Sequence, residues 1–399
     1  MVLIKFDKSF LLTLFIKVVI LKYMQTSFEL KKHNTVKIFR ALQRHERASR
    51  KELSKITGLS WGSVSAITNE LLSKNIIVAD KEASAGGRPA ETLSLHPTHF
   101  LQLGIDVNSV GLTFAIVNMR GKAIFAETLV LESHKKEYVV DTLLTQTEKI
   151  LAQTENVIGI SLSMQGKINR KTGISIRASF ENWQNVPLVE LFEKRFSLPT
   201  TLYHDPDCLL YYHLYNDEQL RDKKDGYVIR LDNGIGMARL LHGKLYNVGD
   251  VGSYEFDQII AVPNGRACSY GNAGCLDAYA SLRSMREIYA EQTGDEQSDF
   301  TQKLREHEET AWNVLRVGTT YLGIAIANLF TLSAPEFVLL DGALLTIVPH
   351  CFTEIDKSVR EHSNDSYNLL CANYKKEAPA IGACLITLEN NTEELLFDL

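Results

Sequence analysis

Several features that would place a chain in a special class are scarce in this sequence. Six cysteines among 399 residues are too few for a disulfide scaffold. A net charge of −5 with 23% charged residues means that neither sign dominates, so the whole chain is not a general binder of polyanions. The composition is that of a globular protein, and 399 residues exceed one ordinary hydrophobic core. We therefore expect two or three domains.

The cysteines also indicate the compartment. Four of them have no metal-ligand spacing, and we expect them to be buried thiols of a protein in the reducing cytoplasm. These four are Cys208, Cys351, Cys371 and Cys384.

The most apolar stretch of the chain lies near its start, in residues 10–21. A signal peptide or a membrane anchor would account for it. The stretch is too short to span a bilayer, it contains Lys17, and no small-residue cleavage site follows it. We expect no membrane association, a natural start at Met24, and a non-native or disordered extension over residues 1–24.

The charge is distributed unevenly along the chain. Residues 25–96 contain twelve basic and seven acidic side chains, although the whole chain is acidic. A basic head on an acidic body is typical of a DNA-binding domain joined to a regulatory domain.

The head carries the signals of a helix-turn-helix. Ser49 and Glu52 form a capping-box pattern, Gly58 stands where the turn needs a left-handed backbone, and Ser60 can cap the next helix. Apolar residues at helical spacing are expected to form its core. They are Ile38, Phe39, Leu42, Leu53, Ile56, Val64, Ile67, Leu71 and Leu72.

The opposite face of the last helix is predicted to read base edges in the major groove. Its residues are Ser60, Trp61, Ser63, Ser65, Ala66 and Asn69. A β-hairpin wing is expected to follow, with Arg88 held extended by Pro89 and able to enter a minor groove. Any three-helix bundle with a glycine turn could mimic part of this pattern. The agreement of caps, core, wing and charge favours a winged helix-turn-helix over residues 25–97.

The body is predicted to be α/β and two-lobed, like the actin-like ATPases and sugar kinases. A β-β-β-α-β order marks a first lobe over 98–220, onto which a C-terminal helix over 379–399 is expected to pack. A second lobe is expected over 221–378. The predicted elements are strands 101–107, 112–117, 122–130 and 157–164 with helix 137–154, then strands 227–231 and 337–340 with helices 276–291 and 300–332.

Several stretches carry a family resemblance. They are Gly87-Arg88-Pro89, residues 182–188 (NWQNVPL), His204-Asp205, Gly234-Ile235-Gly236, and residues 265–281 (GRACSYGNAGCLDAYAS). From about Gln25 to Leu388 the sequence resembles the ROK family (repressors, open reading frames and sugar kinases), and within it the xylose-repressor-like transcription factors.

The resemblance implies a damaged nucleotide site. Active kinases of the family hold phosphate with D-x-G-G-T, where this chain has residues 106–110 (DVNSV). Their second phosphate loop, G-T-G-I-G, contains Asp232 and Asn233 here, and the later glycine pair is Asp341-Gly342. Glycine lets backbone N–H groups approach phosphate closely, so these losses argue against the use of ATP.

The resemblance also implies a sugar site. Asp205 aligns with the family's catalytic aspartate, a general base in the kinases, while Glu255 and Asp277 align with its sugar-binding carboxylates. His204 and Gln258 are further candidates, and Gln258 replaces a family histidine. These five residues predict a sugar-type effector, although a different sugar, a phosphosugar or no ligand would also fit the altered contacts.

The family holds a structural zinc ion with that histidine and three cysteines. This chain keeps Cys268 and Cys275 but has Gln258 and Tyr270 at the other two positions. A closed tetrahedral site needs four ligands, so we expect no zinc and no other cofactor, and the two cysteines are weak metal candidates only.

Together these features predict a cytoplasmic repressor of carbohydrate-utilisation genes. It would bind a double-stranded operator as a homodimer or tetramer and respond to a sugar held by a non-catalytic body. Two alternatives remain. The chain could be an ATP-dependent sugar kinase with an added head, or a regulator controlled by a protein partner with a vestigial sugar pocket.

Overall fold

The computed structural model describes residues 28–82, 90–246, 255–268, 270–348, 350–363 and 366–397. The extension expected over residues 1–24 and the predicted DNA contact Arg88 lie outside these ranges. The chain divides into two compact units. Unit 1 comprises Met1–Phe100, Asn118–Lys122 and Leu388–Leu399, and unit 2 comprises Leu101–Val117 and Ala123–Thr387.

Unit 1 contains the predicted winged helix-turn-helix. A helix over residues 28–45 precedes α2 (Arg50–Thr57) and α3 (Trp61–Ser73), and β1 (Ile77–Glu82) pairs antiparallel with β2 (Ala90–Leu95). The structure confirms the capping signals of the sequence. Ser49 and Glu52 form a complete capping box, and Gly58 ends α2 in the left-handed region at φ +71°.

The core of this head matches the sequence prediction with one exception. The residues of the first helix and of α3 that were predicted for the core are buried or packed against it, and Leu53 is fully buried. Ile56 was expected to be buried, but it is 45% exposed. Helix α2 has about two turns, and Leu53 is its only buried residue. Ile56 lies at the edge of the apolar face that Leu53 occupies.

Two segments distant in sequence complete unit 1. Met119, in the turn between two strands of the body, and Leu396, near the end of α13 (Ala378–Phe397), both belong to the hydrophobic core of the head. Arg120 of the same turn donates from Nε to the carbonyl oxygen of Leu95 over 2.9 Å. The expectation that all of residues 379–399 pack on the first lobe is therefore wrong, because residues from Leu388 onward group with the head.

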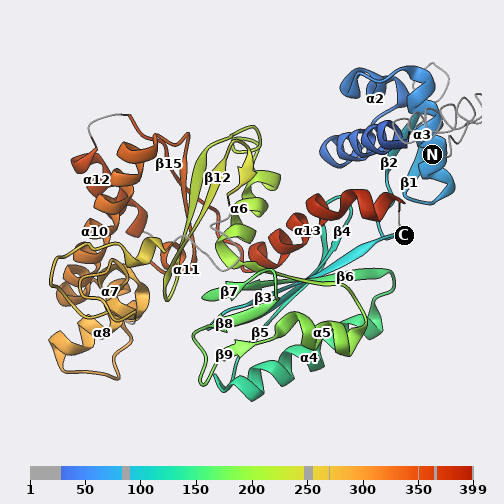
Figure 1. Ribbon diagram of the computed structural model, residues 1–399. Helices are drawn as coiled ribbons and strands as arrows, with labels where there is room; N and C mark the ends of the chain where they lie inside the picture. Colours follow the sequence, from blue (N-terminus) through green and yellow to red (C-terminus); the bar gives the residue numbers. More distant parts are fainter. Residues whose placement is uncertain are drawn as a thin grey trace, which may run out of the picture. The chain divides into compact units, whose positions relative to one another are not determined.

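Unit 2 is built on two five-stranded sheets. The first has the order β10-β6-β3-β4-β5, and the chain runs through β3, β4, β5, α4 and β6, which confirms the predicted β-β-β-α-β sequence. Helices α4 and α5 cover one face of this sheet (Figure 1). The elements are β3 (Leu101–Val107), β4 (Gly111–Asn118), β5 (Ala123–Val130), α4 (Lys136–Gln153), β6 (Val157–Met164), α5 (Leu188–Phe196) and β10 (Thr200–His204).

The second sheet has the order β13-β12-β11-β14-β15. It comprises β11 (Gly226–Leu231), β12 (Ile235–Leu241), β13 (Lys244–Leu245), β14 (Val338–Asp341) and β15 (Leu369–Cys371). Apolar residues of α6 (Asp205–Asn216) and of the first half of α13 share one core cluster with β4, β11, β12 and β14. Gly104 of β3 permits this packing, since a Cβ there would lie 2.1 Å from the carbonyl oxygen of Ala380.

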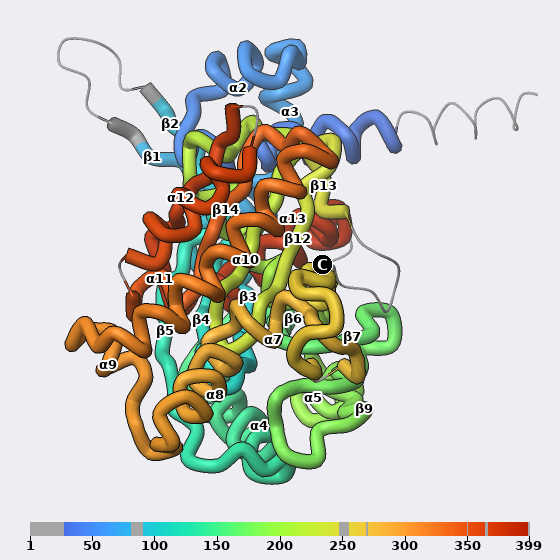
Figure 2. The backbone as a smooth tube through the Cα atoms, turned by 90° about the vertical axis from the view of Figure 1, so that its left-hand side faces the viewer, coloured from blue at the N-terminus to red at the C-terminus, as the bar shows by residue number. Residues whose placement is uncertain are grey.

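Two long helices expected in the second lobe are each interrupted. Residues 276–291 form α7 (Asp277–Ala280) and α8 (Leu282–Thr293), because the side chain of Ser281 caps α8. Residues 300–332 form α9 (Phe300–Arg305) and α10 (Glu309–Ser333), and Glu308 caps α10. Helix α10 packs along α12 (Cys351–His362; Figure 2).

Helix α10 is the one candidate membrane span in the described part of the chain, by length and apolar composition. Half of its apolar window is buried inside the protein, as in the core helix of a globular domain.

Three of the four isolated cysteines are buried as expected: Cys208, Cys351 and Cys384. Cys371 is exposed, contrary to the prediction, because β15 forms the edge of its sheet.

Three short strands form a separate small sheet in the first lobe. They are β7 (Lys167–Asn169), β8 (Ile174–Arg177) and β9 (Gln184–Val186), in the order β7-β8-β9. Trp183, from one of the stretches that carry the family resemblance, is buried beneath it and donates from Nε1 to Oγ of Ser175 over 2.8 Å.

Candidate functional site

The outer face of α3 carries the residues expected to read DNA. Trp61 is 58% exposed, Ala66 is also exposed, and Ser63 and Ser65 are half-buried, whereas Val64 between them is fully buried. The helix thus presents small and hydrogen-bonding side chains opposite its apolar stripe. Their contacts with bases remain a prediction.

Two of the proposed DNA contacts also have structural partners. The Ser60 hydroxyl accepts the backbone N–H of Ser63 over 3.2 Å as the cap of α3. Oδ1 of Asn69 accepts from Nη2 of Arg50 over 3.1 Å. Arg50 also pairs with Glu91 of β2, so this arginine, which the sequence analysis missed, links α2, α3 and the wing.

A cavity of ≈ 740 Å³ lies within unit 2. Its walls come from the residues after β6, the β10–α6 junction, the β11–β12 turn, the short 3-10 helix Phe256–Gln258, and α8. All five sugar-site candidates line this cavity: His204, Asp205, Glu255, Gln258 and Asp277. Residues from positions 204 to 277 are thus gathered at one site.

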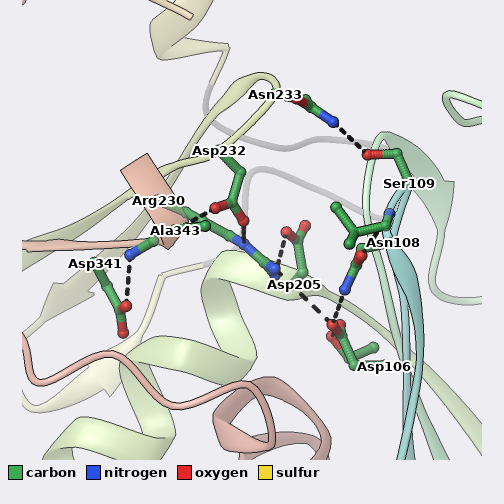
Figure 3. Close-up of polar contacts among 12 residues, drawn as sticks. Asp106, Asn108, Ser109, Asp205, Arg230, Asp232, Asn233, Asp341 and Ala343 are labelled. Carbon is green, nitrogen blue, oxygen red and sulfur yellow. Dashed lines mark hydrogen bonds and ion pairs between the residues drawn. The ribbon is translucent and has the colours of Figure 1, made fainter. Parts of the chain in front are cut away.

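Asp205 is held by a buried arginine that the sequence analysis missed. Nη1 of Arg230 donates to Oδ2 of Asp205 over 2.8 Å, and Nη2 lies 3.9 Å from Oδ2 of Asp106 (Figure 3). Burial raises the pKa of Asp205 to about 6, and the charge of Arg230 opposes this shift. Arg230 itself is only 6% exposed. A buried charge is costly unless it is paired, and the carboxylates around Arg230 balance its positive charge.

The loop between β3 and β4 and the turn between β11 and β12 are hydrogen-bonded to each other. Nδ2 of Asn233 donates to Oγ of Ser109 over 2.9 Å (Figure 3). In the first loop, Nδ2 of Asn108 donates to Oδ2 of Asp106 over 2.8 Å. Side-chain hydrogen bonds therefore link these two loops and fix the first of them.

Asp232 and Asp341 are engaged in a similar way. Oδ2 of Asp232 accepts from Nε of Arg230 over 2.6 Å, while its Oδ1 accepts the backbone N–H of Ala343 over 2.6 Å. Asp341 is fully buried and lies 2.6 Å from Nε2 of His213. Both acidic residues are thus bonded to groups of the protein itself.

Two buried polar atoms at the cavity are unsatisfied. Among the described residues, Nδ1 of His204 and Nε2 of Gln165 have no hydrogen-bond partner. Burial lowers the pKa of His204 to about 4, so its ring is neutral at neutral pH. Both residues line the cavity, and buried polar atoms normally find partners. Gln165 had no signal in the sequence.

Glu255 and Gln258 lie at the two ends of one 3-10 turn, with their side chains on the same side. Nε2 of Gln258 donates to Oε2 of Glu255 over 2.7 Å. Between them, the buried Asp257 accepts from the Tyr270 hydroxyl over 2.6 Å, and burial raises the pKa of Asp257 to about 6. Asp257 and Tyr270 also line the cavity, and the guanidinium of Arg177 lies 5.1 Å from the centroid of the Tyr270 ring.

Asp277 is 2% exposed and forms an ion pair with Arg283 of α8. Burial raises the pKa of Asp277, and the charge of Arg283 counteracts that shift.

The residues at the family's zinc position do not make a closed ligand set. Cys268 and Cys275 are neighbours, but the hydroxyl of Tyr270 is bonded to Asp257 and the amide of Gln258 to Glu255. No group of three or more His, Cys, Asp or Glu side chains suited to a metal ion occurs in the described part of the chain. These residues do not fit a tetrahedral zinc site.

Comparison with known proteins fits this architecture. The profile described as "ROK family" matches residues 102–390. The chain belongs to the ROK family. Its head, residues 32–78, matches the profile "Winged helix-turn-helix DNA-binding". The predicted family and fold class are thus confirmed.

Named relatives extend over nearly the whole chain. A xylose repressor of Bacillus spizizenii is 24% identical over 90% of this chain and 96% of its own length. The solved structure of a ROK family transcriptional regulator, a homologue of the E. coli MLC protein, has a TM-score of 0.76 and is 24% identical. That match covers 92% of this chain and 98% of the regulator.

A second solved structure matches the body. It is a ROK family glucokinase from Streptomyces griseus in complex with glucose and AMPPNP, with a TM-score of 0.62 and 21% identity. The match covers 71% of this chain and 97% of the glucokinase. At these identities the likeness establishes the fold.

Proposed function

We propose that this protein is a DNA-binding repressor of sugar-utilisation genes, controlled by a sugar or sugar derivative bound in the cavity of unit 2. The observation that carries the proposal is the union, in one chain, of a winged helix-turn-helix and a ROK body along 96% of the length of a xylose repressor. It acts in the cytoplasm, where operator DNA is found.

The chemistry of the cavity supports a polyhydroxylated ligand. Carboxylates accept hydrogen bonds from hydroxyl groups with charge assistance, and Asp205 and Glu255 both line the cavity. The unsatisfied Nδ1 of His204 and Nε2 of Gln165 add two groups that a ligand can satisfy.

The body acts without catalysis in this proposal. A general base must accept a proton from the sugar hydroxyl, but Asp205 is bound to a guanidinium. The direct bond between Asn233 and Ser109 joins the two loops that hold phosphate in the kinases. Asp232 also adds negative charge beside the position of a triphosphate, which opposes nucleotide binding.

Regulation needs two states with different affinities for the sugar. We propose a homodimer, or a tetramer made of two such dimers, in which the two α3 helices of a dimer read half-sites about 34 Å or a multiple of this apart. Sugar binding in unit 2 shifts the dimer away from the geometry that fits the operator.

The test is fluorescence anisotropy of the full chain on labelled DNA from upstream of its own gene. A panel of neutral sugars, sugar phosphates and sugar acids is titrated at fixed salt, because salt alone changes affinity for DNA. We expect tight, sequence-selective binding that one ligand of the panel releases. An Asp205→Asn variant should keep DNA binding and lose the release.

The other outcomes separate the alternatives. Selective binding that no sugar releases would favour control by a protein partner. ATP turnover that depends on Asp205 would favour the kinase. Absence of selective binding would refute the repressor.

A further inference from the structure

Cys268 and Cys275 lie closer together than a shared metal ion would hold them. Their Sγ atoms are 2.8 Å apart. Two thiolates on one tetrahedral zinc ion, each about 2.3 Å from it, lie about 3.8 Å apart. The sulfurs of a disulfide are about 2.05 Å apart. We propose that Cys268 and Cys275 are an oxidisable dithiol that forms a reversible disulfide within the chain.

The backbone around the pair holds both cysteines in place. The backbone N–H of Cys268 donates to the carbonyl oxygen of Asn272 over 2.8 Å, and Cys275 forms a bridge with Ile260. Gly274 has φ +84°, and a Cβ there would lie 1.7 Å from the carbonyl oxygen of Val262. Only glycine fits at this position, and the tight turn keeps the two thiols side by side.

The other two positions of the family's zinc set are committed to different bonds. Tyr270 donates its hydroxyl to Asp257 over 2.6 Å, and Gln258 donates to Glu255 over 2.7 Å. The loop has therefore lost two metal ligands and kept the two thiols that are adjacent. A covalent bond between these thiols restores a cross-link at the same place.

The different exposure of the two thiols determines which of them reacts first with an oxidant. Cys268 is partly exposed and Cys275 is buried. The Cys268 thiolate attacks one oxygen of a peroxide such as hydrogen peroxide, and the O–O bond breaks. This leaves a sulfenic acid, and the released hydroxide takes up a proton to become water. The Cys275 sulfur then attacks the Cys268 sulfur, and hydroxide leaves and takes up a proton as a second water. Both thiols are oxidised by one peroxide, and a dithiol reductant reverses the reaction.

The disulfide would lie in the loop that supplies part of the cavity wall. Tyr270 follows Cys268 by two positions, Asp277 follows Cys275 by two, and both line the cavity. Oxidation would therefore restrain a segment that carries two cavity residues. Any effect on the response to a sugar rests on the proposed function, whereas formation of the disulfide does not.

The sequence provides a direct assay. Trypsin cleaves after Arg266 and Arg283, so both cysteines fall on one peptide, residues 267–283. The full chain is reduced, exposed to hydrogen peroxide, denatured, alkylated with iodoacetamide and digested. Before oxidation we expect this peptide to carry two carbamidomethyl labels. After oxidation we expect it to carry none and to be two hydrogen atoms lighter than the unlabelled reduced peptide. Treatment with dithiothreitol before alkylation should restore both labels. The exposed Cys371 is an internal control for contact with the oxidant.

Three results would overturn the proposal. The peptide could keep both labels at a peroxide dose that oxidises Cys371. Cys268 could instead pair with a cysteine outside the peptide. The reduced chain could bind one zinc ion that protects both thiols from alkylation. A Cys275→Ser variant should stop at the Cys268 sulfenic acid, which dimedone traps, and the wild-type peptide keeps the test valid if this variant fails to fold.

Discussion

Nη1 of Arg230 donates to Oδ2 of Asp205 over 2.8 Å, and the same guanidinium donates from Nε to Oδ2 of Asp232 over 2.6 Å. One buried cation thus bridges a carboxylate at the start of α6 and a carboxylate in the β11–β12 turn. Removing such a cation leaves buried anions without compensation, which costs far more than the pair contributes.

An Arg230→Met variant should therefore be strongly destabilised. We expect its free energy of unfolding to fall by about 3–5 kcal/mol, as for a broken buried ion pair. Urea unfolding followed by circular dichroism measures this. Arg360→Met is the matched control, because Arg360 pairs with Asp356 at the surface, and it should change the midpoint little. Equal midpoints for the two variants would refute a buried structural role for Arg230.

The proposed sugar site makes a separate prediction about affinity. Asp205→Asn and Glu255→Gln each remove a charged acceptor at the cavity, and each should weaken binding of the releasing sugar by about 1.5–3 kcal/mol. Isothermal titration with the sugar found by anisotropy tests this. Asp295→Asn changes an exposed carboxylate remote in sequence and should leave affinity unchanged. Unchanged affinity in both cavity variants would place the ligand elsewhere.

The outer face of α3 predicts a loss of DNA binding without a loss of stability. Ala66 is exposed, so Ala66→Glu costs the core nothing but sets a negative charge toward the phosphates and bases. We expect operator affinity to fall at least tenfold with an unchanged melting temperature. Ser73→Glu places the same charge on an exposed position at the other end of α3 and should have a smaller effect. The prediction fails if the two variants bind alike.

Asp257 predicts a pH dependence of stability. Its pKa is raised to about 6 by burial from a usual value of 3.8, so the folded state binds more protons than the unfolded state between these values. The free energy of unfolding contributed by this group therefore falls as the pH rises from 4 to 6. The lowered pKa of His204 acts oppositely over the same range, so a variant must isolate Asp257.

The comparison is between wild type and Asp257→Asn, which can still accept from Tyr270. The stability of wild type minus that of the variant should decrease by about 3 kcal/mol between pH 4 and pH 7, from two pKa units. Urea unfolding at four pH values measures the difference. Parallel pH profiles for the two proteins would show that Asp257 titrates normally.

The sequence predicted the architecture well because its signals are local or periodic. The capping box at Ser49, the left-handed Gly58 and the run of apolar and small residues in the buried strand at residues 157–164 each depend on near neighbours. Helix breaks were missed where one capping side chain, such as Ser281, ended an otherwise continuous pattern.

The sequence predicted five residues that the structure brings to one cavity, but it did not predict their contacts. In the sequence, Arg230 has no feature that distinguishes it from other polar residues of a strand. Its role follows from the fold, which brings it to Asp205, 25 positions away in the sequence. Gln165 has no motif, and only its unsatisfied buried amide marks it. Tertiary proximity creates both features, so no local pattern could reveal them.

The turn at Asn118–Lys122 gives a last prediction, on the stability of unit 1. Arg120 donates from Nε to the Leu95 carbonyl over 2.9 Å and from Nη2 to Oγ of Ser94 over 3.0 Å. Arg120→Ala removes these bonds and leaves the buried Ser94 hydroxyl without this donor. We expect a loss of about 1–3 kcal/mol in unit 1, seen as faster hydrogen exchange in β2.

Lys122→Ala is the control on the same turn, because Lys122 pairs with Glu46 where both side chains are more than half exposed. An exposed pair contributes little, so exchange in β2 should stay close to wild type in this variant. If the two variants accelerate exchange equally, the turn stabilises the head through its charge and not through the buried contacts of Arg120.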